Sequence, residues 1–382
     1  MDEQIIRQFL TDNAALPEQL LRALCGIPAP SHKEDERAAF CKKWLEDIGA
    51  EGVYIDEAKN VIFPIGCDGK TDITVFAAHT DTVFPDLEPM PYVDDGERIH
   101  CPGVGDDTAS VVTILMAAKF FVQNHIVPPH GVLFVCNSCE EGLGNLKGSR
   151  RLFDDFAGRI GRFVTVDGTL DEICNRCVGS HRYRVTVKTP GGHSFSCFGN
   201  TNAIAVLSQI VRDIYALEVP KKEGVHTTYN VGTIAGGTSV NTIAQEAEML
   251  CEYRSDDVEC LKEMRRHFEE IFARYNKGDA TVTATLIGER PCADGVDAAA
   301  QAQLETLCAE SISAVTGEET PFRSGSTDCN IPQSRGIPAV CVGGYYGKGE
   351  HTREEWIEKN CLSIGTESTL RLALKLTTEA YV

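Results

Sequence analysis

Long hydrophobic stretches and an excess of positive charge are both absent from this sequence. No run of roughly 18 or more apolar residues is free of charge, so no transmembrane helix is expected. Lys and Arg total 36 against 56 Asp and Glu, which gives a net charge of −20 at pH 7. Such an acidic chain repels phosphate backbones and anionic lipid, which argues against nucleic acid and membrane surfaces as partners.

Export and disulfide signals are also lacking. Residues Met1–Arg7 carry acids early and no long apolar run, unlike a secretory signal or a mitochondrial presequence. The 16 cysteines are scattered, and the C-x-x-C pair Cys174 and Cys177 has no second pair at zinc-ribbon spacing. We therefore expect reduced thiols and a cytoplasmic protein.

What is present is a chain of 382 residues with 42% apolar residues, long enough for two domains or three. Three-to-four spacing of apolar residues predicts helices within residues 1–50, with Ser31 and Glu34 as a candidate capping box. Short apolar runs bounded by Gly and Asp predict buried strands, with a helix at Ser110–Phe121 between two of them. These runs are Val61–Ile65, Ile73–Ala78, Val132–Cys136, Phe163–Val166 and Ala339–Val342.

The pattern changes near residue 180. Alternating strands at Tyr183–Lys188 and Thr281–Ile287 enclose two helical runs, Asn202–Ala216 and Cys260–Tyr275. From Asp297 the α/β pattern returns with a helical run at Gln301–Val315. The sequence thus predicts an α/β catalytic domain with a mixed, mostly parallel sheet between helices, formed by residues 1–179 and 294–382. A smaller α+β domain, residues 180–293, is inserted into it.

Two motifs follow the first predicted strands. In Ala77-Ala78-His79-Thr80-Asp81-Thr82, His79 is a candidate metal ligand and Asp81 a candidate partner for its other ring nitrogen. In Gly103-Val104-Gly105-Asp106-Asp107-Thr108, a Gly-rich turn leads into a helix. Its two carboxylates would repel a phosphate, so a cation fits better, although Asp107 or Thr108 could instead cap the helix.

Three further motifs end strands or loops. Adjacent Glu140 and Glu141 point in different directions, so that one can bind a metal while the other faces a bound water. Asp167 ends an apolar run, and His351 follows a flexible Gly-rich loop. The carboxyl ends of strands are where open α/β sheets place their sites. Two histidines and three carboxylates fit two metal ions that share one carboxylate, and N/O donors without thiolate suit zinc, with cobalt or manganese as substitutes.

Taken in order, these motifs resemble a known family of di-zinc aminopeptidases and deacylases. It includes peptidase T, glutamate carboxypeptidase, acetylornithine deacetylase and aminoacylase. The resemblance covers nearly the whole chain and implies a zinc-exopeptidase-like catalytic domain with a lid and dimerisation domain. The matching segments are H-T-D-T (79–82), G-V-G-D-D (103–107), E-E-G (140–142), V-D-G (166–168), G-G-H-S (191–194) and E-H-T (350–352).

The resemblance implies a role for each residue of the centre. His79, Asp106 and Asp167 would hold one zinc ion; Asp106, Glu141 and His351 would hold the other, with Asp106 shared. Asp81 would orient His79. Glu140 would take a proton from a metal-bridging water and deliver it to the leaving amine.

The inserted domain carries further implied roles. His193 would reach the active site of a partner subunit and stabilise the oxyanion, which implies a homodimer formed through this domain. Asn241 and Arg254 would bind the substrate carboxylate, and the loop containing Ser326 would line the site.

Two departures from the family pattern stand out. Thr108 occupies a position where most members have Lys, and Asp167 stands where the carboxypeptidase and deacetylase branches often have Glu. The V-D-G form is closest to the peptidase T branch, which favours a tripeptide aminopeptidase or dipeptidase. An N-acyl-amino-acid deacylase or carboxypeptidase is the alternative, and a non-catalytic metal-binding protein is a third reading that Glu140 argues against.

Overall fold

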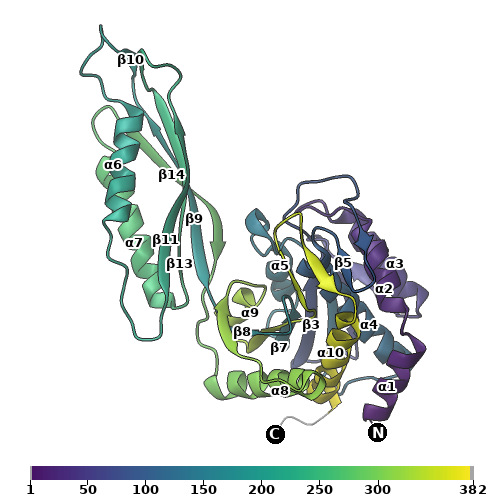
Figure 1. The fold of residues 1–382 in the computed structure, drawn as a ribbon. Coiled ribbons are helices and arrows are strands. Elements are labelled where there is room, and N and C mark those ends of the chain that lie inside the picture. Colours follow the sequence, from purple (N-terminus) through teal and green to yellow (C-terminus); the bar gives the residue numbers. More distant parts are fainter. Residues whose placement is uncertain (1, 379–382) are drawn as a thin grey trace. The chain divides into compact units, whose positions relative to one another are not determined.

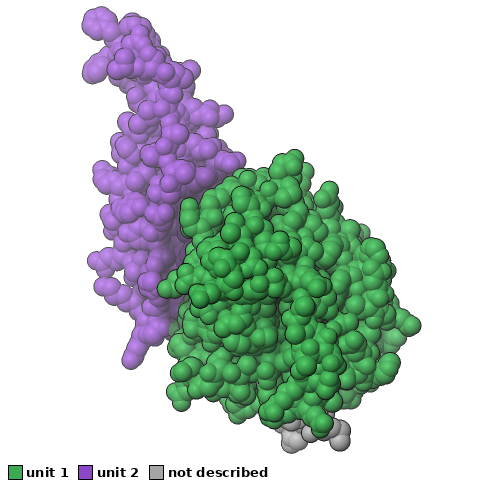
Figure 2. Space-filling model, turned by 45° about the vertical axis from the view of Figure 1, so that its right-hand side comes forward, with its two compact units in different colours: residues 1–177, 294–382 green, residues 178–293 purple. Residues whose placement is uncertain are grey.

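The computed structural model describes residues 2–378, which form two compact units. Unit 1 contains the described residues up to Cys177 and from Asp294 onward, and unit 2 is Val178–Ala293 (Figure 2). The first boundary lies two residues before the one expected from the change in sequence pattern, and the second coincides with it. No helix of residues 2–378 is long and apolar enough to cross a membrane.

Unit 1 is built around one mixed sheet with helices on its faces (Figure 1), which confirms the predicted fold class. In sheet order its strands are β1 (Tyr54–Ile55), β2 (Val61–Ile65), β6 (Val132–Asn137), β3 (Ile73–His79), β7 (Ile160–Val166), β16 (Ala339–Val342), β8 (Ile173–Cys177) and β15 (Phe322–Gly325). The neighbours β6, β3, β7 and β16 run parallel to one another. All residues of β3 and β6 are buried, as expected for central strands covered on both faces.

Two apolar clusters cover the two faces of this sheet. The larger contains residues of α1–α4, α8 and α10, and the smaller contains residues of α5 and α9. These helices are α1 (Asp2–Asp12), α2 (Leu16–Cys25), α3 (Asp35–Asp47), α4 (Ser110–Gln123), α5 (Lys147–Asp155), α8 (Ala298–Thr316), α9 (Asn330–Ser334) and α10 (Cys361–Thr378). The ring of Phe134 on β6 contacts Phe76 on β3 and Phe121 on α4, which joins helix to sheet.

A second, four-stranded sheet of unit 1 brings distant segments together. Its order is β17 (Gly347–Lys348), β18 (Trp356–Glu358), β5 (Arg98–His100) and β4 (Val93–Asp94). The pairing of Ile357 with Ile99 places the segment after His351 beside the segment that leads to Asp106. The sequence did not predict this sheet, because its strands span only two or three residues.

Unit 2 is an antiparallel sheet with two helices packed on it. Its strands are β11 (Thr227–Gly236), β13 (Glu246–Ser255), β9 (Gly179–Lys188) and β14 (Thr281–Arg290), in that order, with a separate pair formed by β10 (Gly192–His193) and β12 (Thr242–Ile243). Helices α6 (Ala203–Tyr215) and α7 (Val258–Tyr275) share an apolar core with one face of β9 and β13 (Figure 1). Asn202 and Asp257 cap these helices by accepting hydrogen bonds from main-chain N–H groups.

Candidate metal centre

Four of the predicted site residues converge at one edge of the unit 1 sheet. His79 is the last residue of β3, Asp167 directly follows β7, and Glu140 and Glu141 lie just after β6. Because these three strands are parallel neighbours, their carboxyl ends meet at the same edge. Sequence reasoning from strand ends therefore located this part of the site.

Asp106 occupies the middle of the centre. Its Oδ1 lies 3.1 Å from Nε2 of His79, and its Oδ2 lies 3.0 Å from Nε2 of His351. Nε2 of His351 also lies 3.1 Å from Oε1 of Glu141. One carboxylate thus contacts two imidazoles through its two oxygens, which is the position a shared ligand requires.

The possible ligand atoms form three overlapping groups, and in each group they lie within 4.8 Å of one another. The groups are Asp106, Glu141 and His351; His79, Asp107 and Asp167; and His79, Glu140 and Glu141. Asp167 therefore groups with Asp107 here rather than with Asp106.

Asp107 does not cap a helix, the alternative that the sequence left open. Its Oδ2 accepts a hydrogen bond from the main-chain N–H of His79 at 2.9 Å. Its Oδ1 is buried without a hydrogen-bond partner in the described chain. Helix α4 instead begins after Ala109 with no side-chain cap.

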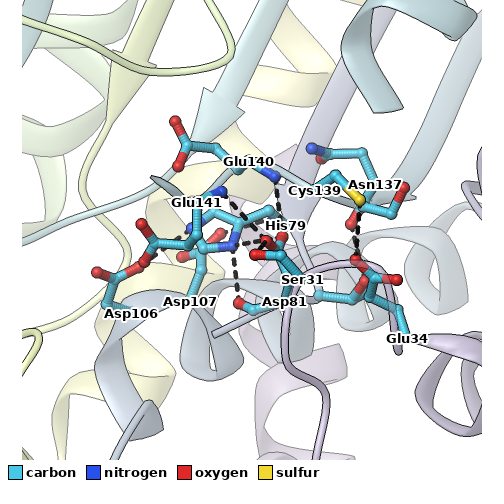
Figure 3. Close-up of polar contacts among 12 residues, drawn as sticks. Ser31, Glu34, His79, Asp81, Asp106, Asp107, Asn137, Cys139, Glu140 and Glu141 are labelled. Atoms are coloured by element: carbon cyan, nitrogen blue, oxygen red, sulfur yellow. Dashed lines mark hydrogen bonds and ion pairs between the residues drawn. The ribbon is translucent and has the colours of Figure 1, made fainter. Parts of the chain in front are cut away.

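Asp81 lies on the other side of the His79 ring from Asp106, beside Ser31 (Figure 3). Its carboxylate accepts hydrogen bonds from the main-chain N–H groups of Glu140 at 2.9 Å and Glu141 at 3.1 Å. The Nδ1 atom of His79 lies 3.4 Å from this carboxylate and 3.0 Å from the main-chain oxygen of Asp81. Asp81 therefore positions both glutamates as well as His79, a wider role than sequence reasoning expected.

Ser31 completes the surroundings of Asp81 and corrects one prediction. Its hydroxyl donates a hydrogen bond to Oδ2 of Asp81 at 2.6 Å. Glu34 precedes α3 without a side-chain cap bond and accepts a hydrogen bond from the main-chain N–H of His32 at 2.8 Å. The predicted Ser31–Glu34 capping box is therefore wrong. The Ser31 hydroxyl contacts Asp81, and the Glu34 carboxylate contacts the main chain of His32 and the thiol of Cys139.

Glu140 and Glu141 leave the chain in different directions (Figure 3). The Glu141 carboxylate lies beside Asp106, while Glu140 forms a separate group with His79 and Glu141. Both glutamates are buried. The two carboxylates therefore face different neighbours, and their division into a ligand and a base stays a prediction.

The pKa values of the site residues are shifted, because several buried carboxylates lie close together and are stabilised by nearby positive charge. Burial raises the pKa of Asp167 well above its ordinary value and that of Glu141 to about 7. Hydrogen bonds to Asp106 and Glu141 raise the pKa of His351 to about 11. At Asp106, the hydrogen bonds from His351 and His79 outweigh burial and lower the pKa.

This donor set fits divalent metal ions. It offers imidazole nitrogen and carboxylate oxygen without thiolate, which suits zinc and similar ions. Two or more negative charges in a buried space are costly unless cations neutralise them. The described cysteines lie in no such group of ligand atoms, and all of them except Cys197 are buried.

Asp328 belongs to the loop that the family resemblance implied would line the site, but sequence reasoning gave this residue no contacts of its own. It is buried and accepts hydrogen bonds from the side chains of Asn137 and Ser149. Burial, together with the nearby charge of Glu140, raises its pKa to about 6. Ser326 lies on the same loop, half-buried, after β15. An acidic residue after a short Ser/Gly-rich run was the available signal.

The three remaining predicted residues belong to unit 2. Exposed His193 and Asn241 lie together, since the main-chain N–H of Ser194 donates to the carbonyl of Asn241 at 2.9 Å. Arg254 lies at the opposite end of β13 from them, about 25–30 Å along the strand at about 3.3 Å per residue, and pairs with Glu252. The structure therefore brings His193 together with Asn241 but not with Arg254.

The ring of His193 has a defined orientation within its loop. The main-chain N–H groups of Phe195 and Ser196 both point at Nδ1, at 3.3 and 3.4 Å. Because two donors face Nδ1, this nitrogen accepts and the proton of the neutral ring resides on Nε2.

Comparisons with known proteins indicate a family for this chain. A model of Peptidase family M20/M25/M40 matches residues 75–375. The uncharacterized protein YqjE of Bacillus subtilis is 24% identical over 364 residues, which cover 91% of this chain and 94% of that protein. A probable carboxypeptidase of Trichophyton verrucosum is 24% identical over 306 residues, which cover 72% of this chain and 66% of that protein.

Solved structures share the fold. A tripeptidase from Staphylococcus aureus has a TM-score of 0.76 at 20% identity and covers 95% of this chain and 98% of its own. The aminopeptidase PepT from Bacillus cereus has a TM-score of 0.72 at 20% identity and covers 99% of both chains.

Proposed function

The chain belongs to Peptidase family M20/M25/M40, and from this we propose that the centre in unit 1 holds two zinc ions and hydrolyses the amide bond of short peptides. The observation that carries the proposal is the contact of the two Asp106 oxygens with His79 and His351. His79, Asp106 and Asp167 hold one ion, and Asp106, Glu141 and His351 hold the other. Cobalt or manganese are substitutes with suitable donor preferences.

Metal ions bound here supply Lewis acidity, which lowers the pKa of water and polarises a carbonyl group. The residues of the chain perform the remaining steps. Glu140 accepts a proton from the attacking water and returns it to the leaving amine nitrogen. Asp81 fixes the main chain of Glu140 and orients His79.

His193 is the proposed oxyanion donor, supplied by a partner subunit. Its Nε2–H is available because the main-chain donors of Phe195 and Ser196 occupy Nδ1. A donor aimed at the developing oxyanion stabilises the tetrahedral transition state. Asn241 lies beside His193 and is proposed to bind substrate with it, while Arg254 and Ser326 are proposed as separate contacts to the substrate.

The role of Glu140 is tested by Glu140→Ala in the zinc-loaded chain. Loss of the base lowers kcat by about 10²- to 10⁴-fold. The zinc content stays near two per chain, because Glu140 is not a proposed ligand. Metal analysis of the purified variant and peptide hydrolysis rates measure the two quantities. Activity retained at wild-type level would refute the assignment of the base.

Short peptides with a free amino terminus are the proposed substrates, since the V-D-G form at 166–168 resembles the peptidase T branch. The alternative, a deacylase or carboxypeptidase, shares the same metal chemistry, and a probable carboxypeptidase is among the relatives. Hydrolysis rates for one tripeptide, free and N-acetylated, separate the two. A requirement for the free amine supports the first, and a preference for the blocked form supports the second.

A metal-dependent binding protein without catalysis is the remaining alternative. A site that only binds has no need of a buried carboxylate beside the ligands, as Glu140 is. Failure of the metal-loaded chain to hydrolyse a broad panel of peptides and acyl-amino acids would favour this alternative.

A homodimer formed through unit 2 is proposed, because His193 acts on a partner's site in this scheme. The molar mass from light scattering after size exclusion is expected to be twice that of one chain. A monomer with full activity would contradict the role of His193.

Cytoplasmic location is proposed from the reduced cysteines, all but one of which are buried.

A further inference from the structure

The carboxylate of Glu355 is buried in unit 1, with 1% of the residue exposed. It lies four residues after His351 and immediately before β18. Its Oε1 accepts hydrogen bonds from the main-chain N–H groups of Gly105 at 2.8 Å and Asp106 at 2.9 Å, and its Oε2 accepts one from Gly103 at 2.5 Å. A single side chain thus accepts hydrogen bonds from three main-chain donors of the loop that carries the central carboxylate.

This arrangement needs a carboxylate. Three converging N–H groups require acceptors only, and both oxygens of an ionised carboxyl are acceptors. Burial and the nearby charge of Asp106 raise the pKa of Glu355 to about 8, and the three N–H donors act against this shift by stabilising the ionised form. An amide side chain would present one NH2 group to a main-chain N–H, which places donor against donor.

The same C-terminal segment contacts the loop a second time. A β-carbon added to Gly105 would lie 2.6 Å from the ring of Tyr345, which is fully buried, so that the ring packs directly against the main chain there. The hydroxyl of Tyr345 donates to Glu350 at 3.3 Å. His351 therefore lies on a segment whose two ends, Tyr345 and Glu355, both contact the Asp106 loop.

We propose that Glu355 is a positioning residue that fixes Asp106 relative to His351 for metal binding. Asp106 and His351 come from distant parts of the chain, and their side chains lie 3.0 Å apart. Glu355 connects the main chain beside one of them to the segment that carries the other. Substitution of a residue that positions a metal ligand without binding the metal typically weakens metal affinity by about 10- to 100-fold. The inference rests on the proposed function only for the identity of the ligands.

Glu355→Gln tests the proposal in the full chain with Zn²⁺ or Co²⁺ alone as the probe. We expect the dissociation constant of at least one of the two metal ions to rise about tenfold or more, measured by competition with a chelator. In the metal-free variant, amide exchange of the peptide that contains residues 103–106 is expected to accelerate. Glu354→Gln, at the exposed neighbouring residue, is the matched control and is expected to change neither quantity.

Wild-type metal affinity and unchanged exchange in folded Glu355→Gln would overturn the role of Glu355. If this variant does not fold, Glu355→Asp replaces it, since Asp keeps both acceptor oxygens on a shorter side chain. A weaker metal affinity supports the proposal, whereas lower stability of the metal-free chain with wild-type affinity overturns it. Failure of the wild-type chain itself to bind two ions would instead refute the proposed function, so the two failures are distinguishable.

Discussion

Asp81 connects three parts of the metal centre at the scale of a single residue. It is fully buried and contacts His79, the hydroxyl of Ser31 and the main chain of both glutamates. The hydrogen bonds it accepts, with His79 foremost among their donors, lower its pKa against the effect of burial, so the group is ionised at neutral pH. One charged acceptor thus fixes a ligand and the base together.

Asp81→Asn tests this connection. Asn has the same shape but directs an NH2 group at one of the donors, so a hydrogen bond is replaced by a repulsive contact. We expect metal affinity or kcat/KM to fall about 10- to 100-fold. Chelator competition and steady-state kinetics provide the measurements. Ser31→Ala removes only one of the donors and serves as a control with a smaller effect; an Asp81→Asn variant no weaker than this control would contradict the account.

At this scale the sequence predicted the residue types but not their contacts. His79, Asp106, Glu141 and His351 were assigned, and the structure brings them together. The additional contacts of Asp107 could not be predicted, because the direction of each of two adjacent carboxylates depends on the backbone of the turn. The contact of Ser31 was missed since it joins residues 50 positions apart.

Helix α3 supports the metal centre at the scale of elements. Arg37 on this helix is 3% exposed, and its guanidinium donates to the main-chain oxygens of Thr80 at 2.9 Å, Leu24 at 3.0 Å and Ile27 at 2.7 Å. It also donates to the hydroxyl of Thr108 at 3.3 Å. Arg37 thus brings positive charge beside Thr108, one of the two residues that depart from the family pattern.

Arg37→Met is expected to lower the free energy of unfolding by about 3 kcal/mol, because the buried carbonyl groups lose their donor. Urea unfolding of the metal-free chain measures this change. Arg7→Met is the matched control, since Arg7 forms an exposed ion pair with Glu3 that is worth less than about 1 kcal/mol. Equal stability of the two variants would contradict the supporting role of Arg37.

A buried histidine gives the sheet of unit 2 a dependence on pH. Nδ1 of His181 on β9 lies 2.6 Å from the hydroxyl of Tyr253 on β13, and its Nε2 lies 3.2 Å from Glu289 on β14. Burial lowers the pKa of His181 below its ordinary value of 6.5. Below about pH 6.5 the unfolded chain therefore binds a proton that the folded chain does not, and stability falls as the pH falls.

His181→Gln is expected to remove this part of the pH dependence. Urea unfolding at several values between about pH 5 and 7.5 gives the slope for wild type and variant. His226→Gln, at an exposed position of the same unit, is the control. A slope in His181→Gln as steep as in the wild type would contradict the prediction.

Central elements were predictable and peripheral ones were not. Strands β2, β3, β6, β7 and β16 follow apolar runs because both faces of the central sheet are buried. Strands β1 and β15 lie at the edges of the sheet and expose most of their residues, so they carry no such pattern. The pairing of β18 with β5 depends on contacts between distant segments, which periodicity does not reveal.

At the scale of the whole molecule, the change from buried runs to alternating strands near residue 180 indicated a discontinuous unit 1 and an inserted unit 2. The metal centre lies entirely in unit 1, whereas His193 and Asn241 lie in unit 2. A role for His193 at a partner's site depends on contacts between chains. The sequence of one chain predicts such contacts only through its resemblance to a family.

The number and position of the metal ions test the central claim most directly. Crystals of the zinc-loaded chain, measured above and below the zinc absorption edge, are expected to show two anomalous peaks per chain on either side of Asp106. One peak is expected to contact His79 and Asp167, and the other Glu141 and His351. A single peak, or peaks that do not share Asp106, would contradict the account.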